Sequence, residues 1–423
     1  MARLFIFLNI FFVLVATTTS LTEHNPKPKP RPKQKPHAFV LTVFKDTQTG
    51  IYYTNVTVGK PSLVVNLAVD VRGSALWFQC DELGYNSTTY TPILCGSNGC
   101  EQTKDQCLTC MGTYGPSCRN DTCHAYLQTQ MTYNTVLASL VKDDVVLSYT
   151  SPSTRLPLAC MSASEVVAGL PYGTQGILGL GNSSTSFVKA MVSSYKIPFK
   201  VALCLPSKPG NDSGAVYIGG RPYRLRPNRK DVSGLLVSTP LVSIPETRER
   251  GEDNYYIDVK SIQVNGKKLS FNHDLLTFNK TSHWGGTKIS NIIPYTLLET
   301  SIYKALAKAF VGKAQKRKAI YPFTDCFSYK SFGGKSLLEK EVPVISLVLG
   351  GGAKWDIYGP NSLVKVKKTV LCLAFVDAGD GPRIPIEIGG YQMEDNLVEF
   401  DLDASKFSFS SSLLRHNTSC SGL

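Results

Sequence analysis

The sequence predicts a mainly β, disulfide-rich protein built in two halves. Three observations support this fold class: many short segments alternate apolar and polar residues, Gly and Pro are frequent, and there are 12 cysteines. Glycines number 34 and prolines 24, whereas only 18% of the 423 residues are charged. Because 43% of the residues are hydrophobic, the chain can form sizeable cores, and global disorder is excluded.

Residues 1–20 have the pattern of a secretory signal peptide. Arg3 gives a basic start, residues 4–15 are mostly apolar, and small residues precede an expected cleavage site near Ser20. A membrane anchor is disfavoured because this apolar run is shorter than the roughly 20 residues that a bilayer core requires. No later segment approaches that length, so we expect a secreted, extracellular protein without a membrane span, whose cysteines form disulfides.

Residues 21–37 form a basic arm rich in Pro and Lys. Residues 25–36 have no apolar side chain to bury, so we expect a solvated, polyproline-like conformation. The formal net charge of the whole chain is +13. We expect no nucleic-acid partner, since a secreted glycoprotein rarely meets nucleic acid. An acidic cell-wall polysaccharide or an acidic protein is a better match for this charge.

Seven Asn-X-Ser/Thr motifs agree with export, and we expect their asparagines to be exposed glycosylation sites. They are Asn55, Asn86, Asn120, Asn182, Asn211, Asn279 and Asn417.

The first half contains strand patterns on both sides of a cysteine-rich loop that extends from Cys80 to Cys123. We expect strands at residues 38–43, 52–58, 63–69, 144–149, 176–180, 201–205 and 215–218. A Pro/Arg-rich linker follows over residues 221–228. The sequence therefore predicts an N-terminal lobe over residues 38–230 and a C-terminal lobe over residues 231–423.

The second half repeats the strand pattern and adds one clear helix. Asn265-Gly266 is a typical hairpin turn. Leu297, Leu298, Ile302, Leu306 and Phe310 recur at helical spacing, which predicts a helix over residues 294–315. Strands are expected at residues 255–264, 344–349, 355–358, 370–375, 384–388 and 397–400.

The remaining candidate chemistry is that of carboxylates. The chain has no G-x-S-x-G, H-E-x-x-H or P-loop motif, and Cys107 and Cys110 are better explained as structural disulfide partners than as a zinc or redox pair. We therefore expect neither a metal nor a cofactor. Asp70 ends an apolar strand before a turn. In the second half, the glycine-rich segment that ends at Ser290 has a similar order of glycine, strand, turn and helix.

The chain contains a set of characteristic motifs at residues 175–181, 254–262, 285–290, 294–303, 386–390, 388–397 and 396–401, together with its twelve-cysteine layout. Through these motifs it resembles, over residues 38–420, the pepsin-like aspartic proteases. Within them it resembles the plant group that includes extracellular dermal glycoprotein, basic 7S globulin and the inhibitors of xylanases and xyloglucan-specific endoglucanases. The resemblance implies a bilobal fold with two β-barrel-like lobes around a central cleft.

The resembling enzymes use two Asp-Thr/Ser-Gly loops, whose carboxylates share a proton and activate water. Here the first loop reads Asp70-Val71-Arg72, and Ser290-Asn291-Ile292 replaces the second. We therefore expect Asp70 to be a relic and the protein to be no enzyme; an active aspartic endopeptidase is the less favoured alternative. Asp212-Ser213-Gly214 matches the motif as a string, but it lies in a polar turn. Tyr133 falls where the flap tyrosine of the enzymes would stand.

The resemblance also implies a function in plant defence. Basic residues from loops of the C-terminal half would enter the cleft of a cell-wall-degrading glycoside hydrolase of microbial or plant origin, of the endoglucanase or xylanase type, in the apoplast. Arg383 matches the loop arginine of the family, and Lys316 and Arg317 are candidates in a second loop. The alternative is a glycoprotein that binds a peptide hormone or the cell wall and has no enzyme target.

For the cysteines, the resemblance implies a Cys326–Cys372 bridge, which leaves Cys204 and Cys420 as a natural pair. The other eight should pair among themselves in an order that the sequence leaves open: Cys80, Cys95, Cys100, Cys107, Cys110, Cys118, Cys123 and Cys160.

Overall fold

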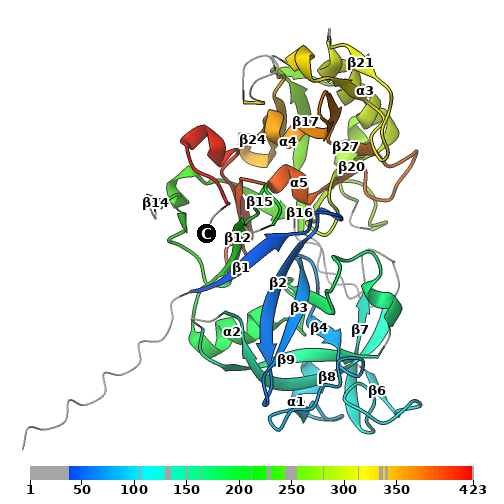
Figure 1. The fold of residues 1–423 in the computed structure, drawn as a ribbon, viewed down its shortest axis with the longest axis vertical. Helices are drawn as coiled ribbons and strands as arrows, with labels where there is room; N and C mark the ends of the chain where they lie inside the picture. The colour runs from blue at the N-terminus through cyan, green and yellow to red at the C-terminus, as the bar shows by residue number, and fades with distance from the viewer. Residues whose placement is uncertain are drawn as a thin grey trace, which may run out of the picture. The chain divides into compact units, whose positions relative to one another are not determined.

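The computed structural model describes residues 38–421 except for 104–105, 129–134, 149–150, 163, 211, 226–229, 243–254, 280, 313, 333–336 and 339–341. The expected signal peptide, the basic arm, Tyr133 and the sequon asparagine Asn211 therefore lie outside the described residues. From Pro36 onward the chain forms one compact unit. Strands predominate in it, which confirms the mainly β class (Figure 1).

The strands of the first half follow the alternation of the sequence. In β1, Phe39, Leu41 and Val43 are buried, whereas Val40 and Thr42 between them are exposed. This is the pattern of a sheet with one face on a core. The strands are β1 (Phe39–Lys45), β2 (Tyr52–Val58), β3 (Leu63–Asp70), β4 (Leu76–Gln79), β5 (Thr91–Pro92), β6 (Gln106–Leu108), β7 (Thr122–Gln128), β8 (Thr135–Val146), β9 (Thr154–Met161), β10 (Gly176–Gly179), β11 (Lys200–Cys204), β12 (Ser213–Ile218), β13 (Arg224–Leu225) and β14 (Lys230–Asp231).

The second half is also built from short strands. Two four-stranded sheets, β18-β17-β23-β24 and β21-β22-β26-β25, stand apart from the large sheet. The strands are β15 (Val237–Val242), β16 (Tyr255–Ile257), β17 (Val259–Val264), β18 (Lys267–Lys268), β19 (Thr287–Ile289), β20 (Thr296–Leu298), β21 (Lys316–Arg317), β22 (Cys326–Ser328), β23 (Ile345–Leu349), β24 (Lys354–Ile357), β25 (Leu363–Lys367), β26 (Val370–Leu373), β27 (Phe375–Asp377), β28 (Ile386–Ile388), β29 (Leu397–Asp401) and β30 (Lys406–Phe409).

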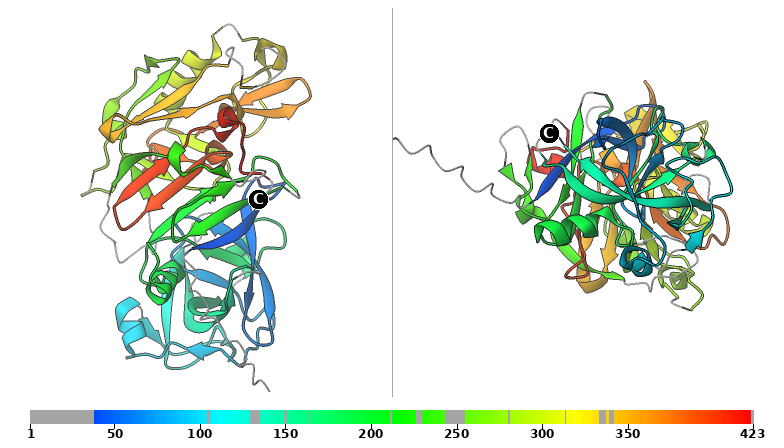
Figure 2. Two further views of the ribbon diagram at one scale, coloured as in Figure 1. Left: turned by 90° about the vertical axis from the view of Figure 1, so that its left-hand side faces the viewer. Right: turned by 90° about the horizontal axis from the view of Figure 1, so that it is seen from below.

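One continuous sheet joins the two halves. Strand β11 pairs with β12 on one side and with β29 on the other, and β30 then connects β29 to β15. In Figure 2 the red strands from the end of the chain lie beside the green strands of the first half. Aromatic side chains fill the core beneath this sheet: Tyr255 stacks on Phe400 with ring centroids 4.5 Å apart, and Trp355 stacks on Phe409 at 5.3 Å. The two halves share a core, because one cluster of buried apolar residues includes Phe39 and Val216 of the first half together with Val398 and Phe409 of the second.

The helix that the sequence predicts over residues 294–315 is shorter in the structure. Helix α3 spans only Thr300–Val311, and Leu297 and Leu298 belong to strand β20, which pairs with β27 and β28. Glu299 fixes the start of the helix, because its carboxylate accepts hydrogen bonds from the N–H groups of Ser301 (2.9 Å) and Ile302 (3.2 Å). The prediction of Pro294–Glu299 as helix was therefore wrong. The other helices are α1 (Asn98–Thr103), α2 (Phe187–Tyr195), α4 (Gly359–Ser362) and α5 (Gly390–Met393).

The expected hairpin turn and the expected cysteine-rich loop are both present. Asn265 and Gly266 both have positive φ (48° and 78°) and connect β17 to β18, as expected for a two-residue hairpin turn. The cysteine-rich segment after Cys80 is largely loop, with the short elements β5, α1 and β6 inside it. No helix in the described part of the chain is long and apolar enough to cross a membrane.

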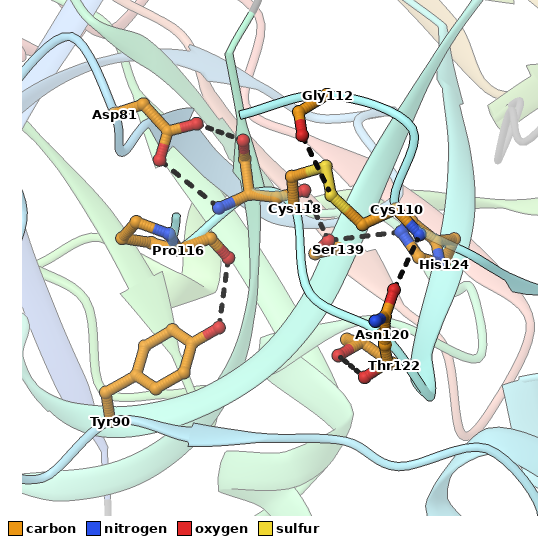
Figure 3. Close-up of a disulfide and its surroundings, with 11 residues drawn as sticks. Asp81, Tyr90, Cys110, Gly112, Pro116, Cys118, Asn120, Thr122, His124 and Ser139 are labelled. Carbon is orange, nitrogen blue, oxygen red and sulfur yellow. Dashed lines mark hydrogen bonds between the residues drawn. A yellow bond between two sulfur atoms is a disulfide. The ribbon is translucent and has the colours of Figure 1, made fainter. Parts of the chain in front are cut away.

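Six disulfides include every cysteine. Two are the bridges Cys326–Cys372 and Cys204–Cys420, and the other eight cysteines pair among themselves as expected. Their order is Cys80–Cys160, Cys95–Cys107, Cys100–Cys123 and Cys110–Cys118. Figure 3 shows how the Cys110–Cys118 loop attaches to the sheet. The hydroxyl of Ser139 on β8 donates to the carbonyl of Ser117 (2.6 Å). Outside the strands, the Tyr90 hydroxyl donates to the carbonyl of Pro116 (2.9 Å), and the carboxylate of Asp81 accepts hydrogen bonds from Ser117.

Candidate functional site

The first candidate loop follows strand β3 and is held rigidly. The carboxylate of Asp70 is 2% exposed and accepts a hydrogen bond from the backbone N–H of Arg72 (2.9 Å). The backbone carbonyl of Asp70 accepts bonds from the N–H groups of Gly73 (3.2 Å) and Leu180 (2.8 Å). A Cβ atom on residue 73 would lie 2.7 Å from Cα of Gly179, so the turn requires glycine at that position.

The second candidate loop lies directly against the first. Strand β19 leads into Ser290, whose N–H donates to the carbonyl of Ile388 (2.8 Å). The side chain of the next residue, Asn291, is fully buried and bridges the two halves of the molecule. Its Oδ1 accepts the N–H of Val71 (2.8 Å), and its Nδ2 donates to the carbonyl of Val69 (2.6 Å). The structure thus brings together the loop at Asp70 and the loop at Ser290, which the sequence identified as corresponding segments of the two halves.

A buried group of charges spans these loops, and the sequence did not reveal it. The Arg72 side chain is 1% exposed, and its Nη2 lies 3.6 Å from Oε1 of Glu387 on β28. Nζ of Lys288 on β19 lies 3.0 Å from the same oxygen. The parallel pairing of β19 with β28 places Lys288 opposite Glu387. We call Arg72, Lys288 and Glu387 the interloop charge cluster.

The interloop charge cluster keeps Glu387 ionised. Burial by itself raises the pKa of the Glu387 carboxyl, but the charges of Lys288 and Arg72 and hydrogen bonding from Lys288 and Ser290 hold this pKa below its usual value. Glu387 is therefore a poor proton donor. The sequence did contain a hint of this cluster: Glu387 lies between Ile386 and Ile388 in a segment expected to be a buried strand, and a buried charge needs a buried partner of opposite charge.

A second buried carboxylate, Glu394, joins strands β1 and β2 to the turn after α5. Its Oε1 lies 2.5 Å from Nζ of Lys45 and accepts a hydrogen bond from the Tyr52 hydroxyl (2.6 Å). Burial raises the pKa of Glu394 to about 7, although Lys45 and Tyr52 act in the opposite direction. This group lies outside the two candidate loops and ties segments distant in sequence.

Arg383 lies in the loop between β27 and β28 and is half-buried. Its Nε donates to the carbonyl of His283 (2.9 Å), and its own carbonyl accepts the N–H of Gly285 (2.9 Å). The base of this loop is fixed to helix α3: the N–H of Thr300 donates to Gly379, and the Thr300 hydroxyl donates to Asp377 (2.7 Å).

Lys316 and Arg317 form the exposed strand β21, which pairs with β22. Nζ of Lys316 lies 3.6 Å from the carboxylate of Asp325, which also accepts the hydroxyl of Tyr303 on α3 (3.0 Å). Helix α3 therefore supports both basic segments, one through Thr300 and one through Tyr303.

The remaining sequence candidates lie at the surface. Asp212 lies just before β12, and its carboxylate is 3.9 Å from Nζ of Lys208. Among the described residues, this is the ion pair that Asp212 forms, and it does not involve the loop at Asp70. The described sequon asparagines are all exposed: Asn55, Asn86, Asn120, Asn182, Asn279 and Asn417. Among the described residues, no group of three or more His, Cys, Asp or Glu side chains is arranged to hold a metal ion.

Comparison with known proteins places these features in a family. Two family models match the chain, described as xylanase inhibitor N-terminal (residues 52–220) and xylanase inhibitor C-terminal (residues 254–411). The chain is 35% identical over 406 residues to the probable aspartic proteinase GIP2 of Nicotiana benthamiana, covering 91% of each protein. It is 31% identical over 408 residues to the basic 7S globulin of Glycine max, again covering 91% of each.

Solved structures agree with the sequence relatives. The crystal structure of edgp matches with a TM-score of 0.85 and 33% identity, covering 92% of this chain and 98% of that one. The aspartic proteinase from Irpex lacteus matches with a TM-score of 0.57 and 15% identity, covering 89% of this chain and 97% of that one, which shows the fold alone. The bilobal pepsin-like fold that the sequence resemblance implied is confirmed.

Proposed function

Since the chain belongs to the xylanase-inhibitor family of proteins with the pepsin-like fold, we propose that it is a secreted, proteolytically inactive protein that binds and inhibits glycoside hydrolases. The observation that carries the proposal is that helix α3 supports two basic segments, one at Arg383 and the other at Lys316-Arg317. The lobe boundaries at residues 38–230 and 231–423, the glycosylation sites and the extracellular location belong to the same proposal.

The chemistry of the two loops supports proteolytic inactivity. An aspartic protease needs two carboxyl groups that share one proton, so that one acts as acid and the other as base. Ser290 follows β19 where the second acid would stand, and its hydroxyl cannot take that role. Glu387, whose carboxylate is hydrogen-bonded by the Ser290 side chain, is held as an anion by Lys288 and Arg72. A carboxylate fixed in this way cannot supply a shared proton.

This proposal predicts that the purified protein does not cleave a denatured protein substrate at acid pH. A Ser290→Asp variant should stay inactive as well, because Arg72 and Lys288 would pair with the new carboxylate and favour its charged form. Release of acid-soluble peptides, measured with and without pepstatin, checks both forms. Pepstatin-sensitive cleavage by the unmodified protein would contradict the proposal.

The basic segments suit the active site of a glycoside hydrolase. Such enzymes hold two carboxyl groups, roughly 5–9.5 Å apart, in an open cleft. A guanidinium can form two parallel charge-assisted hydrogen bonds to a carboxylate, which both binds the enzyme and excludes its substrate. The Nε–His283 bond of Arg383 fixes the side chain before binding, so less conformational freedom is lost when a partner docks.

We expect Arg383→Ala to weaken inhibition of a susceptible endoglucanase or xylanase by at least about 30-fold, corresponding to roughly 2 kcal/mol for a binding hot spot. Replacing Lys316 and Arg317 together by Ala should give a smaller loss, since exposed charges contribute less. Inhibition constants for a panel of both enzyme types, measured with each variant, test this prediction.

The chain provides a matched control for these variants. Lys267 and Lys268 form the two-residue strand β18, which is exposed and basic like β21. Their replacement by Ala should leave the inhibition constant unchanged. If no hydrolase is inhibited by the unmodified protein, the inhibitor function is wrong, and the binding of a peptide hormone or of the cell wall becomes the better hypothesis.

A further inference from the structure

Trp284 is an exposed tryptophan beside the proposed inhibitory arginine. Its side chain is 52% exposed, whereas Trp77 and Trp355 are 3% and 0% exposed. The residues on either side of it hold Arg383: the carbonyl of His283 accepts Arg383 Nε, and Gly285 donates to the Arg383 carbonyl, both at 2.9 Å. A half-exposed indole at this position has a large apolar surface in contact with water.

Asn279 lies opposite Trp284 on the same short turn. The two residues form an isolated antiparallel bridge, in which the N–H of Asn279 donates to the carbonyl of Trp284 (2.8 Å). Residues directly opposite each other in an antiparallel pair project their side chains to the same face. Both side chains are exposed, so Asn279 and the indole share one surface.

The geometry of Asn279 also suits N-glycosylation. Thr281 completes the sequon two residues later. The side-chain Oδ1 of Asn279 accepts the backbone N–H groups of Thr281 (2.9 Å) and Ser282 (3.0 Å). These bonds orient the amide through its oxygen, and a glycan is attached through its nitrogen. The turn can therefore keep its conformation when the asparagine is modified.

We propose that Asn279 carries an N-linked glycan whose first sugar packs against the indole of Trp284, and that this glycan limits access to Arg383. The C–H face of a pyranose removes apolar indole surface from water. Asn279 is hydrogen-bonded to the carbonyl of Trp284, and Arg383 is hydrogen-bonded to the two residues next to Trp284, so both lie against the same turn. A glycan of several sugars on Asn279 is long enough to extend over this turn. The packing of the sugar on Trp284 does not depend on the proposed inhibitor function, whereas the effect of the glycan on access to Arg383 rests on that proposed function.

Tryptophan fluorescence tests the packing, because only Trp284 of the three tryptophans is accessible to a quencher. We expect acrylamide quenching to rise by about twofold or more when the glycan is lost in Asn279→Gln or Thr281→Ala, as the indole becomes uncovered. Thr281→Ala removes the sequon but keeps the Asn279 side chain. Trp284→Phe should remove most of the quenchable signal, and Asn55→Gln, which lacks the glycan at a distant sequon, should match the unmodified protein.

Mass spectrometry of the protein secreted from a glycosylating host gives the occupancy of Asn279 directly. An unmodified Asn279, or equal quenching of the modified and unmodified forms, would overturn the packing proposal. Circular dichroism of each variant separates these results from misfolding.

Inhibition assays test the effect on access. Loss of the Asn279 glycan should lower the inhibition constant by about three- to tenfold, and this gain should vanish in an Arg383→Ala background. Equal inhibition by both glycoforms would overturn the shielding. If quenching responds to the glycan but no form inhibits any hydrolase, the packing stands and the inhibitor function fails, so the two failures are distinguishable.

Discussion

Replacing Glu387 by Gln will lower the free energy of unfolding by about 3–5 kcal/mol at neutral pH, as expected when one partner of a buried ion pair is removed. The variant keeps the shape of the side chain but leaves the positive charges of Arg72 and Lys288 buried without their shared carboxylate. Their side chains are 1% and 9% exposed, so water cannot replace the lost interaction. Urea unfolding followed by far-ultraviolet circular dichroism measures the loss.

Two control variants test whether this loss of stability comes from breaking the interloop charge cluster. Arg72→Met should cost less than Glu387→Gln, since Lys288 stays 3.0 Å from the carboxylate. Asp258→Asn removes the exposed ion pair with Lys260 and should change stability by less than about 1 kcal/mol. If Glu387→Gln proves as mild as Asp258→Asn, the interloop charge cluster is not a structural element.

The effect of Glu387 should also depend on pH in a defined direction. The pKa of this carboxyl is lowered in the folded protein from its ordinary value of 4.5. Its stabilising contribution is therefore present above that ordinary value and is lost as the pH falls through the folded-state pKa. The difference between the unmodified protein and Glu387→Gln should shrink in strongly acid solution.

Glu394 will have the opposite pH dependence. Its pKa is raised from 4.5 to about 7 in the folded state, first by burial and further by Asp395. The folded protein thus binds the proton more tightly than the unfolded chain does. The resulting stabilisation is complete below pH 4.5, the ordinary pKa, and is lost as the pH rises through about 7. We expect this loss to be about 3 kcal/mol between these limits.

A Glu394→Gln variant isolates this contribution, because an amide does not titrate. Its unfolding free energy, measured at several values between acid and neutral pH, should lack the decline that the unmodified protein has. Lys45→Met removes the cation 2.5 Å from the carboxylate, so the pKa of Glu394 should rise further and the decline should extend to higher pH. Asp212→Asn, a surface carboxylate, is the control without an expected effect. Parallel pH profiles for Glu394→Gln and the unmodified protein would contradict the prediction.

These two carboxylates favour the same conditions for different reasons. The stabilising contribution of Glu387 is lost in strong acid, because Lys288 and Arg72 lower the pKa of its carboxyl. The stabilising contribution of Glu394 is lost at neutral pH, because burial raises the pKa of its carboxyl more than Lys45 lowers it. Both contributions are most favourable in mildly acid solution.

Local patterns in the sequence were sufficient for much of the fold. Alternation in segments such as Phe39–Lys45 and Tyr52–Val58 identified strands, because a strand with one buried face needs that period. The pattern misled at Leu297 and Leu298, whose spacing fits the face of α3 although they lie in β20. A strand of three residues has too few positions to be distinguished from a helix by periodicity. The pairing of β20 with β27 and β28 decides its conformation.

The sequence by itself determined which chemical groups are present: one acid at Asp70, a hydroxyl at Ser290 and basic residues at Arg383, Lys316 and Arg317. Only the tertiary structure decided which groups meet. The contact of Arg72 with Glu387 joins residues in different halves of the chain, and the alignment of Lys288 with Glu387 depends on the register of β19 against β28. The physical reason is that desolvation and Coulomb interactions depend on distance in space, which separation along the chain does not specify.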